Sequence, residues 1–487
     1  MMSSLATLAT MFTPPVLRLT HLNYTICFSL QFDKIIVPAR KKTFKKRGIV
    51  VEHTWKFWTS VAVILIFASV FSALLFGQLD LLEYVRYSGT PSYKVISSFS
   101  SLVGGRSFVL EVTSQKWRNM DWIHKVLVYI PRRLSFKSHA IVVINGSAPR
   151  DLTQSVNQFV TIAELLGAPV VSLWDVPNQP IFGLREDALI AYTFYQYYQS
   201  GEPDWPLLFP MVKSVISTMD CVQEFLQMQG LRVEKFLVTG ASKRGWTAYL
   251  VGAVDPRVMA IVPIVYDNLN MPKQMRKQLE MYGKFSEQIR DYSRYSFTEM
   301  VATSEEIPDL VRAVDPYFYD IPVPKLLILG SNDPYWVVDS SEIYFADLSG
   351  PKYIRVFPNE GHDIRNVTEI VNSIRAFFLL CVGESFPTVD WKFDGEDFIV
   401  KTDSQVEFAR FWYAYSESLD FRKSTWKSFE MGMEHVVQTE TGEFLIRAKP
   451  NDFLIKDKNL AFFVEIGLIR DGIAFVVTTT PKVLRIK

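Results

Sequence analysis

Residues 236–250 read Phe-Leu-Val-Thr-Gly-Ala-Ser-Lys-Arg-Gly-Trp-Thr-Ala-Tyr-Leu. The apolar start of this stretch ends at Thr239 and Gly240, a serine follows at position 242, and the residues after Gly245 are compatible with a helix. This order predicts a strand, a tight turn and a helix, with Ser242 at the apex of the turn. Such a turn exposes the serine hydroxyl and directs backbone N–H groups towards the group that the serine attacks.

The glycine pattern of this turn departs from the usual nucleophile elbow. The G-x-S-x-G pattern has its second glycine two residues after the serine, whereas Arg244 holds that place here and Gly245 comes one residue later. Gly240 and Ala241, before the serine, are small, as a strained turn requires. Taken alone, the pattern also fits an ordinary strand-to-helix turn with a capping serine.

Two later strand-like stretches supply partners for the serine. Residues 325–330 are followed by Asp333, and residues 353–357 are followed by His362. Serine, acid and histidine, in this order, is the arrangement of α/β-hydrolases. In such a triad the histidine accepts the serine proton, and the acid holds the imidazole in the required tautomer. We therefore predict Ser242 as nucleophile, His362 as general base and Asp333 as the acid.

Other residues near these stretches are candidates for supporting roles. Asp267, at the end of an earlier strand-like run, is the alternative acid. An oxyanion hole needs two donors, and we expect the Lys243 N–H with Gly146 or Ser147, in the loop after the strand 140–144. The side chains of Lys243 and Arg244 either add positive charge for an oxyanion or an acidic substrate, or are solvated at the start of the helix. For Arg244 we expect the solvated position.

Alternating apolar runs and helix-compatible segments predict an α/β fold for residues 78–386. The expected sheet is mostly parallel with helices on both faces, as in α/β-hydrolases. About fifty residues separate two of its strands, more than an ordinary connection, and predict a helical cap over about 272–322. The cap tyrosines either line a substrate pocket or pack within the cap: Tyr282, Tyr292 and Tyr295. Residues 81–107 look like a linker and entry segment.

From residue 387 the pattern changes to short strand-like runs separated by turn pairs such as Asp394-Gly395 and Asp471-Gly472. This pattern predicts a small all-β domain at 387–487, in the form of a sandwich. It contains no cluster of catalytic residue types, so we expect a role in packing or recognition.

Residues 57–77 contain no charged side chain, and about 20 such residues suffice to cross a membrane. Basic residues precede this stretch and Asp80 and Glu83 follow it, which predicts a single-pass signal anchor with the N-terminus in the cytosol and the remainder extracellular or lumenal. Residues 1–56 are then predicted to be a disordered cytosolic tail. A cleaved signal peptide and an organelle transit peptide are the alternatives.

The composition of the 487-residue chain is that of a globular protein, with 48% hydrophobic residues, 21% charged residues and a net charge of +1. This balance gives no reason to expect a nucleic-acid partner. The cysteines are Cys27, Cys221 and Cys381; they form neither a disulfide framework nor a zinc pattern, and we expect no metal or cofactor. Of the glycosylation sequons, Asn366 is the plausible acceptor, because Asn145 lies beside the predicted active site.

Several stretches make the chain resemble the PhoPQ-activated pathogenicity-related protein family. They extend from about residue 81 to the C-terminus, and the most specific is Gly240-Ala-Ser-Lys-Arg-Gly-Trp246; others are 203–206, 253–257, 358–362 and 420–422. The resemblance implies an α/β-hydrolase-like domain, usually exported, with a C-terminal β domain. The elbow is also similar to that of glucuronoyl esterases, which place a basic residue directly after the serine, as Lys243 is here.

Two functions follow from the sequence. The first is a membrane-anchored serine hydrolase that cleaves an ester or amide of a small-molecule or peptide substrate. The second is a non-catalytic signalling protein that keeps the hydrolase scaffold, since a fold does not by itself fix a function. One member of the resembled family is known as a secreted signal, and the arginine at position 244 keeps this second interpretation open.

Overall fold

A computed structural model describes residues 79–100, 104–150, 160 and 162–486 of the chain. The predicted tail 1–56 and the predicted membrane segment 57–77 lie outside these described residues. Within the described part of the chain, no helix combines the length and the hydropathy that a membrane crossing requires.

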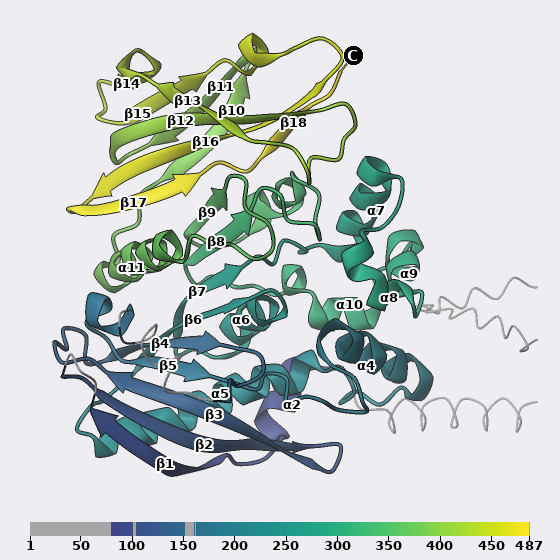
Figure 1. Cartoon of the computed structure of the whole chain (residues 1–487), viewed down its shortest axis with the longest axis vertical. Helices are drawn as coiled ribbons and strands as arrows, with labels where there is room; N and C mark the ends of the chain where they lie inside the picture. Colours follow the sequence, from purple (N-terminus) through teal and green to yellow (C-terminus); the bar gives the residue numbers. More distant parts are fainter. Residues whose placement is uncertain (1–78, 101–103, 151–159, 161, 487) are drawn as a thin grey trace, which may run out of the picture. The chain divides into compact units, whose positions relative to one another are not determined.

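One long sheet organises the described residues, and it contains 14 strands (Figure 1). Its order is β1-β2-β3-β5-β4-β6-β7-β8-β9-β17-β16-β12-β13, with β18 paired to β16. The strands up to β9 are β1 (Ser92–Ser100), β2 (Arg106–Trp117), β3 (Met120–Ile130), β4 (His139–Ile144), β5 (Val170–Leu173), β6 (Lys235–Ala241), β7 (Val258–Ile264), β8 (Lys325–Gly330) and β9 (Lys352–Phe357). The later strands of this sheet are β12 (Gln405–Ser416), β13 (Lys427–Met431), β16 (Asn459–Arg470), β17 (Ile473–Thr478) and β18 (Lys482–Leu484).

The middle of this sheet is parallel. Strands β5, β4, β6, β7, β8 and β9 pair in parallel, whereas β1, β2 and β3 form an antiparallel ribbon at one side. Parallel strands are buried on both faces and therefore need continuous apolar runs, and β5 is buried at every position. The predicted α/β fold with a mostly parallel core sheet is confirmed.

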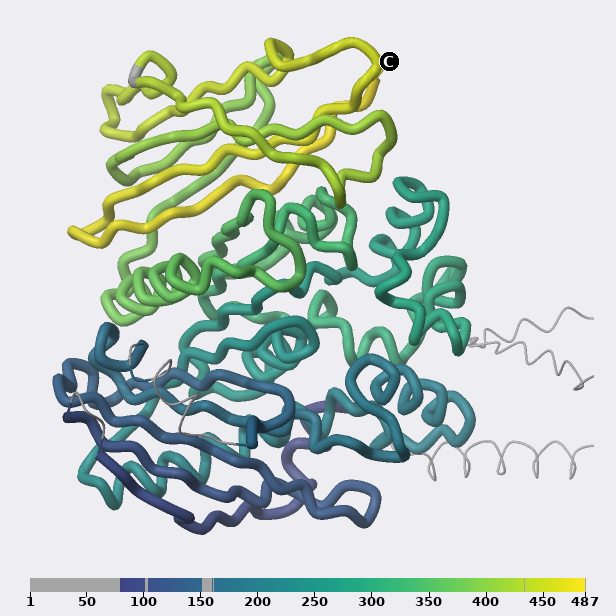
Figure 2. Tube along the Cα trace, in the orientation of Figure 1, coloured from purple at the N-terminus to yellow at the C-terminus, as the bar shows by residue number. Residues whose placement is uncertain are grey.

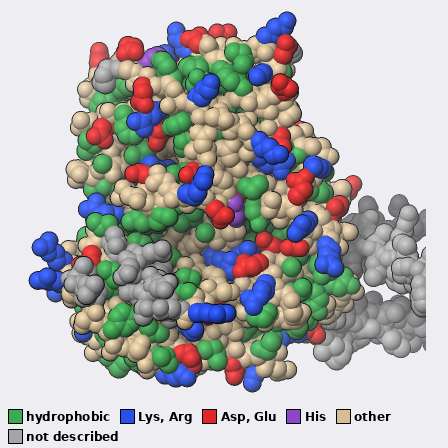
Figure 3. Space-filling model, in the orientation of Figure 1, with side chains coloured by type: hydrophobic (Ala, Val, Ile, Leu, Met, Phe, Trp, Pro, Cys, Tyr) green, Lys and Arg blue, Asp and Glu red, His purple; other side chains and the backbone are tan. Residues whose placement is uncertain are grey.

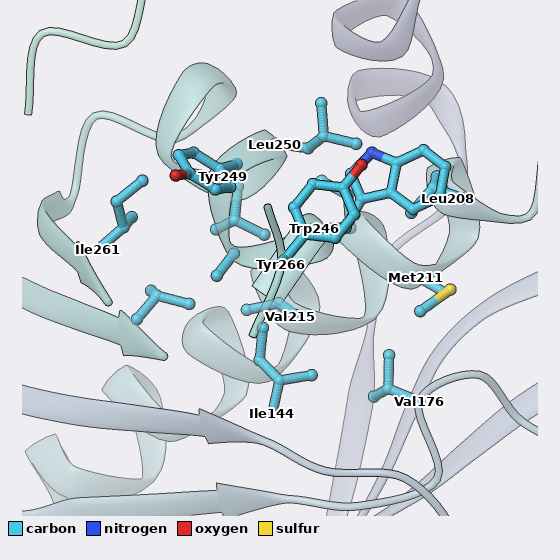
Figure 4. Packing of buried hydrophobic residues seen from close by; sticks show 14 of the residues in the cluster. Ile144, Val176, Leu208, Met211, Val215, Trp246, Tyr249, Leu250, Ile261 and Tyr266 are labelled. Carbon is cyan, nitrogen blue, oxygen red and sulfur yellow. The ribbon is translucent and has the colours of Figure 1, made fainter. Parts of the chain in front are cut away.

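Helices cover both faces of the parallel strands, and each face has its own cluster of buried hydrophobic side chains. One cluster contains side chains of α2, α5 and α6, and the other contains side chains of α11. Figure 4 shows part of the first cluster, where the rings of Trp246 and Tyr266 stack with centroids 5.2 Å apart. The α-helices are α2 (Leu81–Tyr87), α4 (Glu186–Ser200), α5 (Leu208–Met228), α6 (Lys243–Val254), α7 (Met271–Tyr282), α8 (Arg290–Ser293), α9 (Phe297–Thr303), α10 (Asp309–Val314) and α11 (Val367–Gly383).

Residues 81–107 are not a linker, and that prediction is wrong. Asp80 caps α2 by accepting hydrogen bonds from the N–H groups of Leu82 and Glu83, and β1 then pairs antiparallel with β2. The pattern of β1 misled the prediction because most of its side chains are exposed at the edge of the sheet. An edge strand of this kind lacks the apolar alternation by which a half-buried strand is recognised.

A group of short helices lies in the chain between β7 and β8. It consists of α7, α8, α9 and α10 with the 3-10 turns η1 (Glu287–Ile289) and η2 (Pro316–Phe318). Further 3-10 turns occur later, namely η3 (Ser340–Ile343), η4 (Phe345–Asp347), η5 (Met433–His435) and η6 (Pro450–Phe453). The helical segment between β7 and β8 coincides with the cap that the sequence predicted over about 272–322.

The C-terminal residues form two packed β layers. One is a separate sheet in the order β10 (Val389–Asp394), β11 (Asp397–Thr402), β15 (Phe444–Ala448) and β14 (Val436–Gln438). The other is the continuation of the long sheet, because Thr478 of β17 pairs with Ile354 of β9. The rings of Phe398 and Phe462 join the layers with centroids 5.3 Å apart. Figure 2 shows the yellow C-terminal strands next to the green β9 region, and Ser72–Lys487 forms one compact unit.

Candidate active site

The predicted strand, turn and helix around Ser242 are present. Strand β6 ends at Ala241, α6 begins at Lys243, and Ser242 between them has φ 58° and ψ −127°. A positive φ is uncommon for a residue with a side chain, and such strain is typical of functional sites. The Ser242 N–H donates to the carbonyl of Ile264 at the end of β7, 2.8 Å away, which fixes the turn against the neighbouring strand.

Two glycines let the elbow close. A Cβ on Gly240 would lie 2.8 Å from the backbone carbonyl carbon of Arg244, and a Cβ on Gly245 would lie 3.0 Å from the carbonyl oxygen of Gly240. Because no side chain fits in either place, the helix starts directly against the strand. In the usual pattern, the glycine two places after the serine lets the helix approach the strand closely. Here Gly240 and Gly245 allow this approach.

Arg244 is not a solvated residue at the start of the helix, as the sequence led us to expect. It is 9% exposed. Its Nε donates to the carbonyl of Val176 at 2.7 Å, and its two terminal nitrogens donate to the two carboxylate oxygens of Glu186 at 2.7 and 2.8 Å. A Cβ on Gly146 would lie 2.7 Å from Arg244 Nη2, so that glycine makes room for the guanidinium. Arg244 therefore ties the elbow to the start of α4.

Lys243, for which added positive charge and a solvated side chain were both left open, is also buried and paired. Its Nζ lies 2.9 Å from Glu186 Oε2 and 3.4 Å from Asp187 Oδ2, and the side chain is 8% exposed. Burial raises the pKa of the Glu186 carboxyl, but the hydrogen bonds and charge of Arg244 and Lys243 outweigh it and lower that pKa to about 2. Two cations and two carboxylates therefore neutralise each other, and little positive charge remains for an acidic substrate.

His362 and Asp333 form the predicted pair. Asp333 follows β8, His362 follows β9, and His362 Nδ1 lies 2.7 Å from Asp333 Oδ2. The other carboxylate oxygen of Asp333 accepts the backbone N–H of Tyr335 at 2.9 Å. The ring of Tyr335 stacks on the imidazole with centroids 4.2 Å apart. His362 Nε2 is buried and has no hydrogen-bond partner among the described residues, so it is the ring nitrogen that remains for a substrate-side proton.

The alternative acid, Asp267, has a different partner. Its Oδ1 accepts a hydrogen bond from the hydroxyl of Tyr344 at 2.7 Å, whereas His362 contacts Asp333. Burial raises the pKa of Asp267 to about 8, and the nearby charges of Asp333 and Asp339 act in the same direction. A carboxyl held largely neutral at pH 7 is poorly suited to stabilise an imidazolium.

A pocket with a cavity volume of about 50 Å³ opens beside Ser242. Ser242 and Tyr335 both line it, so the predicted nucleophile and the ring that stacks on His362 face one space. The described structure has no hydrogen bond between Ser242 Oγ and His362 Nε2. The face of the molecule in Figure 3 has a hollow in which basic and acidic side chains lie close to a histidine. The cap covers the pocket with side chains of α7, η1, α8 and α9.

The remaining predicted residues divide between the pocket and its surroundings. Lys243 lines the pocket, whereas Gly146 and Ser147 are absent from its wall in the described structure. Of the three cap tyrosines, Tyr292 lines the pocket. Tyr282 instead donates its hydroxyl to the carbonyl of Trp336 at 2.8 Å. The third, Tyr295, stacks on Tyr195 of α4 with ring centroids 5.0 Å apart.

Sequence reasoning missed how the C-terminal layer supports the acid and histidine loops. Asn332, next to the acid, donates through Nδ2 to the carbonyls of Arg422 and Ser424 at 3.2 and 2.7 Å. Asn359, before the histidine, donates to the carbonyl of Trp426 at 3.0 Å and accepts its N–H at 2.8 Å. The sequence signal for this link is an asparagine one residue before Asp333 and another three residues before His362, and such a signal does not name its partner.

A family model provides the decisive comparison, because it matches residues 81–422, which include the elbow and both supporting loops. The chain belongs to the PhoPQ-activated pathogenicity-related protein family. Autocrine proliferation repressor protein A of Dictyostelium discoideum is 35% identical over 307 residues, or 58% of this chain. The match covers 61% of that relative's length, so the chain spans only part of the relative.

Similar folds also occur among solved structures. An acetyl xylan esterase from Paenibacillus sp. R4 has 13% identity and a TM-score of 0.43, covering 61% of this chain and 92% of its own. An S-formylglutathione hydrolase from Agrobacterium tumefaciens has 14% identity and a TM-score of 0.40, covering 60% and 99%. At this level of similarity neither protein indicates what the family member described here acts on.

Proposed function

We propose that this family member is a serine hydrolase that cleaves an ester or amide through an acyl-enzyme. The observation that carries the proposal is the His362–Asp333 pair, with its 2.7 Å contact and the free, buried Nε2 on the other side of the ring. The strained serine at φ 58° and the pocket that it shares with Tyr335 support it. A hydrogen bond between serine and histidine is often long in the absence of substrate and shortens when substrate binds.

In the proposed reaction, His362 Nε2 removes the proton of Ser242 Oγ as the oxygen attacks the substrate carbonyl. Asp333 holds Nδ1 protonated and stabilises the imidazolium that forms. The Lys243 N–H, at the start of α6, is the proposed first oxyanion donor, and Gly146 or Ser147 is the proposed second donor if substrate binding brings that loop to the pocket. The imidazolium then protonates the leaving group, and water releases the acyl group in a second, equivalent step.

Activity-based labelling of the full-length chain tests this function. A fluorophosphonate probe reacts only with an activated serine, so it should label the wild-type protein and not the Ser242→Ala variant. Ser349→Ala serves as the control, because it removes an exposed serine that does not line the pocket. Absence of labelling in a folded wild-type protein, or equal labelling of S242A, would contradict the proposal.

A non-catalytic signalling role is the second candidate. The name of the Dictyostelium relative favours it, as does the missing hydrogen bond between Ser242 Oγ and His362 Nε2 in the described structure. Under this proposal the probe labels nothing, and S242A retains the biological effect of the wild type. A proliferation assay with both proteins therefore separates the two functions.

We also propose that residues 57–77 anchor the chain in a membrane as a single-pass signal anchor, with the hydrolase-like part extracellular or lumenal. The support is the uncharged stretch and the basic residues before it. Asn366 is an exposed sequon asparagine, although its side chain also caps α11 by accepting the N–H of Glu369. Carbonate extraction of membranes tests the anchor, and an Asn366→Gln change in electrophoretic mobility tests glycosylation.

A further inference from the structure

The wall of the pocket beside Ser242 is rich in aromatic rings. Six of its 15 residues carry rings: Trp246, Tyr266, Tyr292, Phe297, Tyr335 and Trp336. Methionine, isoleucine and valine side chains of the cap add further apolar surface, and the remaining residues are polar or charged. Aromatic walls favour flat apolar groups, which stack on them or meet their edges. A short acyl group such as acetyl would leave most of this surface without contact.

The charged residues of the pocket wall do not select an ionic substrate. Lys243 and Asp187 line the pocket, but the lysine Nζ lies 3.4 Å from the aspartate and 2.9 Å from Glu186. Asp187 also accepts the hydroxyl of Tyr292 at 3.1 Å. A charged ligand would have to compete with these contacts and lose its own hydration. The pocket therefore favours a neutral ligand.

Two residues of the wall nevertheless carry buried polar atoms that have no hydrogen-bond partner within the described structure. They are Asn268 Oδ1 and Trp336 Nε1. These residues are 9% and 8% exposed. The first atom only accepts a hydrogen bond and the second only donates one. Buried polar atoms are nearly always paired, so unpaired ones in a pocket wall indicate that a ligand or bound water supplies the partner.

We propose that this pocket binds a neutral aromatic group that carries a hydroxyl, as part of the ester or amide that Ser242 cleaves. A hydroxyl is a neutral group that can both donate to an acceptor such as Asn268 Oδ1 and accept from a donor such as Trp336 Nε1, whereas a carboxylate offers no donor and a plain ring offers neither function. The inference rests on the proposed hydrolase function for the reaction, but the binding of the ring does not depend on catalysis. Substrate class and catalytic activity are therefore tested separately.

Binding is measured by calorimetry with the full-length Ser242→Ala variant, which holds the pocket but not the nucleophile. The ligands are 4-ethylphenol, ethylbenzene and 4-ethylbenzoate, which differ only at the ring position that would meet the polar atoms. Since a net hydrogen bond changes affinity by up to roughly tenfold, we expect the hydroxyl compound to bind about tenfold more tightly than ethylbenzene. Tighter binding of the carboxylate, or equal binding of all three, overturns the proposal.

Variants in the S242A background assign the effect to the polar atoms. Asn268→Leu removes the acceptor at a similar side-chain size and Trp336→Phe removes the donor while keeping an aromatic ring, so each should reduce the preference for the hydroxyl to about threefold or less. Trp122→Phe is the matched control, because Trp122 is fully buried in β3, its Nε1 is also without a partner among the described residues, and it does not line the pocket. A preference that survives both N268L and W336F overturns the assignment.

Hydrolysis by the wild-type chain is followed by acid release in two ester series. One has methyl esters of acetate, 3-phenylpropanoate and 3-(4-hydroxyphenyl)propanoate, and the other has acetates of ethanol, 2-phenylethanol and 2-(4-hydroxyphenyl)ethanol. We expect kcat/KM to rise along at least one series. Probe labelling of Ser242 together with a preference for the smallest ester in both series overturns the substrate class and leaves the hydrolase function standing. Selective binding in calorimetry without probe labelling of Ser242 supports the ligand class and contradicts the hydrolase function.

Discussion

Arg244 holds Glu186 with two parallel hydrogen bonds of 2.7 and 2.8 Å, and it does so from the position where a nucleophile elbow normally has a glycine. The same guanidinium donates to the carbonyl of Val176. The extra side chain therefore joins the elbow to the segments before and at the start of α4. Its presence in the motif serves the architecture of the site and gives no argument against catalysis.

Replacing Arg244 with alanine should destabilise the protein. The change leaves the Val176 carbonyl without its donor, and it leaves the Glu186 carboxylate with Lys243 as its remaining cationic partner. Loss of a buried partner costs about 3–5 kcal/mol, and because the Glu186 side chain is 40% exposed we discount this to about 2 kcal/mol. Denaturant unfolding measures the change. Lys94→Ala, which removes an exposed ion pair with Glu111, should change stability by less than about 0.5 kcal/mol.

The Asp333→Asn variant should keep its fold and lose most of its activity. The asparagine can still accept the Tyr335 N–H through Oδ1, but its amide would face His362 Nδ1 and favour the wrong tautomer. By analogy with triads in general, we expect kcat to fall by about 10³–10⁴. Steady-state kinetics with an ester measures the loss, and Asp267→Asn is the control. A larger loss in D267N than in D333N would assign the acid to the other position.

Tyr335 should act by holding the imidazole in place. Its ring lies 4.2 Å from that of His362, so Tyr335→Phe keeps the stacking whereas Tyr335→Ala leaves the histidine free to rotate. Because small displacements of catalytic groups cost up to about 100-fold, we expect Y335A to lower kcat by about 10–100-fold and Y335F to change it by less than about threefold. Similar kcat values for the two variants would exclude a positioning role for the ring.

The buried Asp267 should make stability depend on pH. Its folded pKa of about 8 is raised from 3.8, so the folded state binds a proton that the unfolded state releases between these values. This contribution is fully present below about pH 4 and is lost as the pH rises through about 8. Asp267→Asn should therefore stabilise the protein at pH 9 by about 4 kcal/mol relative to its effect at pH 5, at about 1.36 kcal/mol for each of about three pH units. The exposed Asp121→Asn should show no such difference between the two pH values.

The link between Asn359 and Trp426 should affect both stability and rate. Asn359→Ala removes a donor and an acceptor, so we expect a loss of about 2 kcal/mol in the free energy of unfolding. It also frees the loop before His362, and we expect kcat to fall about tenfold. Asn451→Ala, at an exposed position of η6, is the control. An unchanged kcat in a destabilised N359A would show that the C-terminal layer supports the fold without positioning the histidine.

Local patterns were sufficient to predict the elements that carry the site. Ser242, Asp333 and His362 each follow an apolar strand, and the ends of parallel strands meet at one edge, so their order along the chain already indicated where they lie. The partner of Arg244 was not readable in this way, because Glu186 is 58 residues away and a buried ion pair leaves no periodic pattern. The arginine was therefore assigned to solvent.

The C-terminal region shows the same limit at a larger scale. Alternation and turn pairs predicted its strands, but nothing local indicated that β17 adds to β9, a contact between residues 124 positions apart. Whether a strand ends one sheet or extends another depends on which edge it meets during folding. The sequence of the strand alone does not contain that information.

The hydrogen bonds of Asn332 and Asn359 to residues 422–426 mean that the C-terminal layer is not an interchangeable module. A chain shortened before β10 would lose the braces of both loops, and it would also leave β9 as an open border able to recruit a foreign strand. Engineers who graft this scaffold should therefore carry the last hundred or so residues with it as part of the catalytic unit.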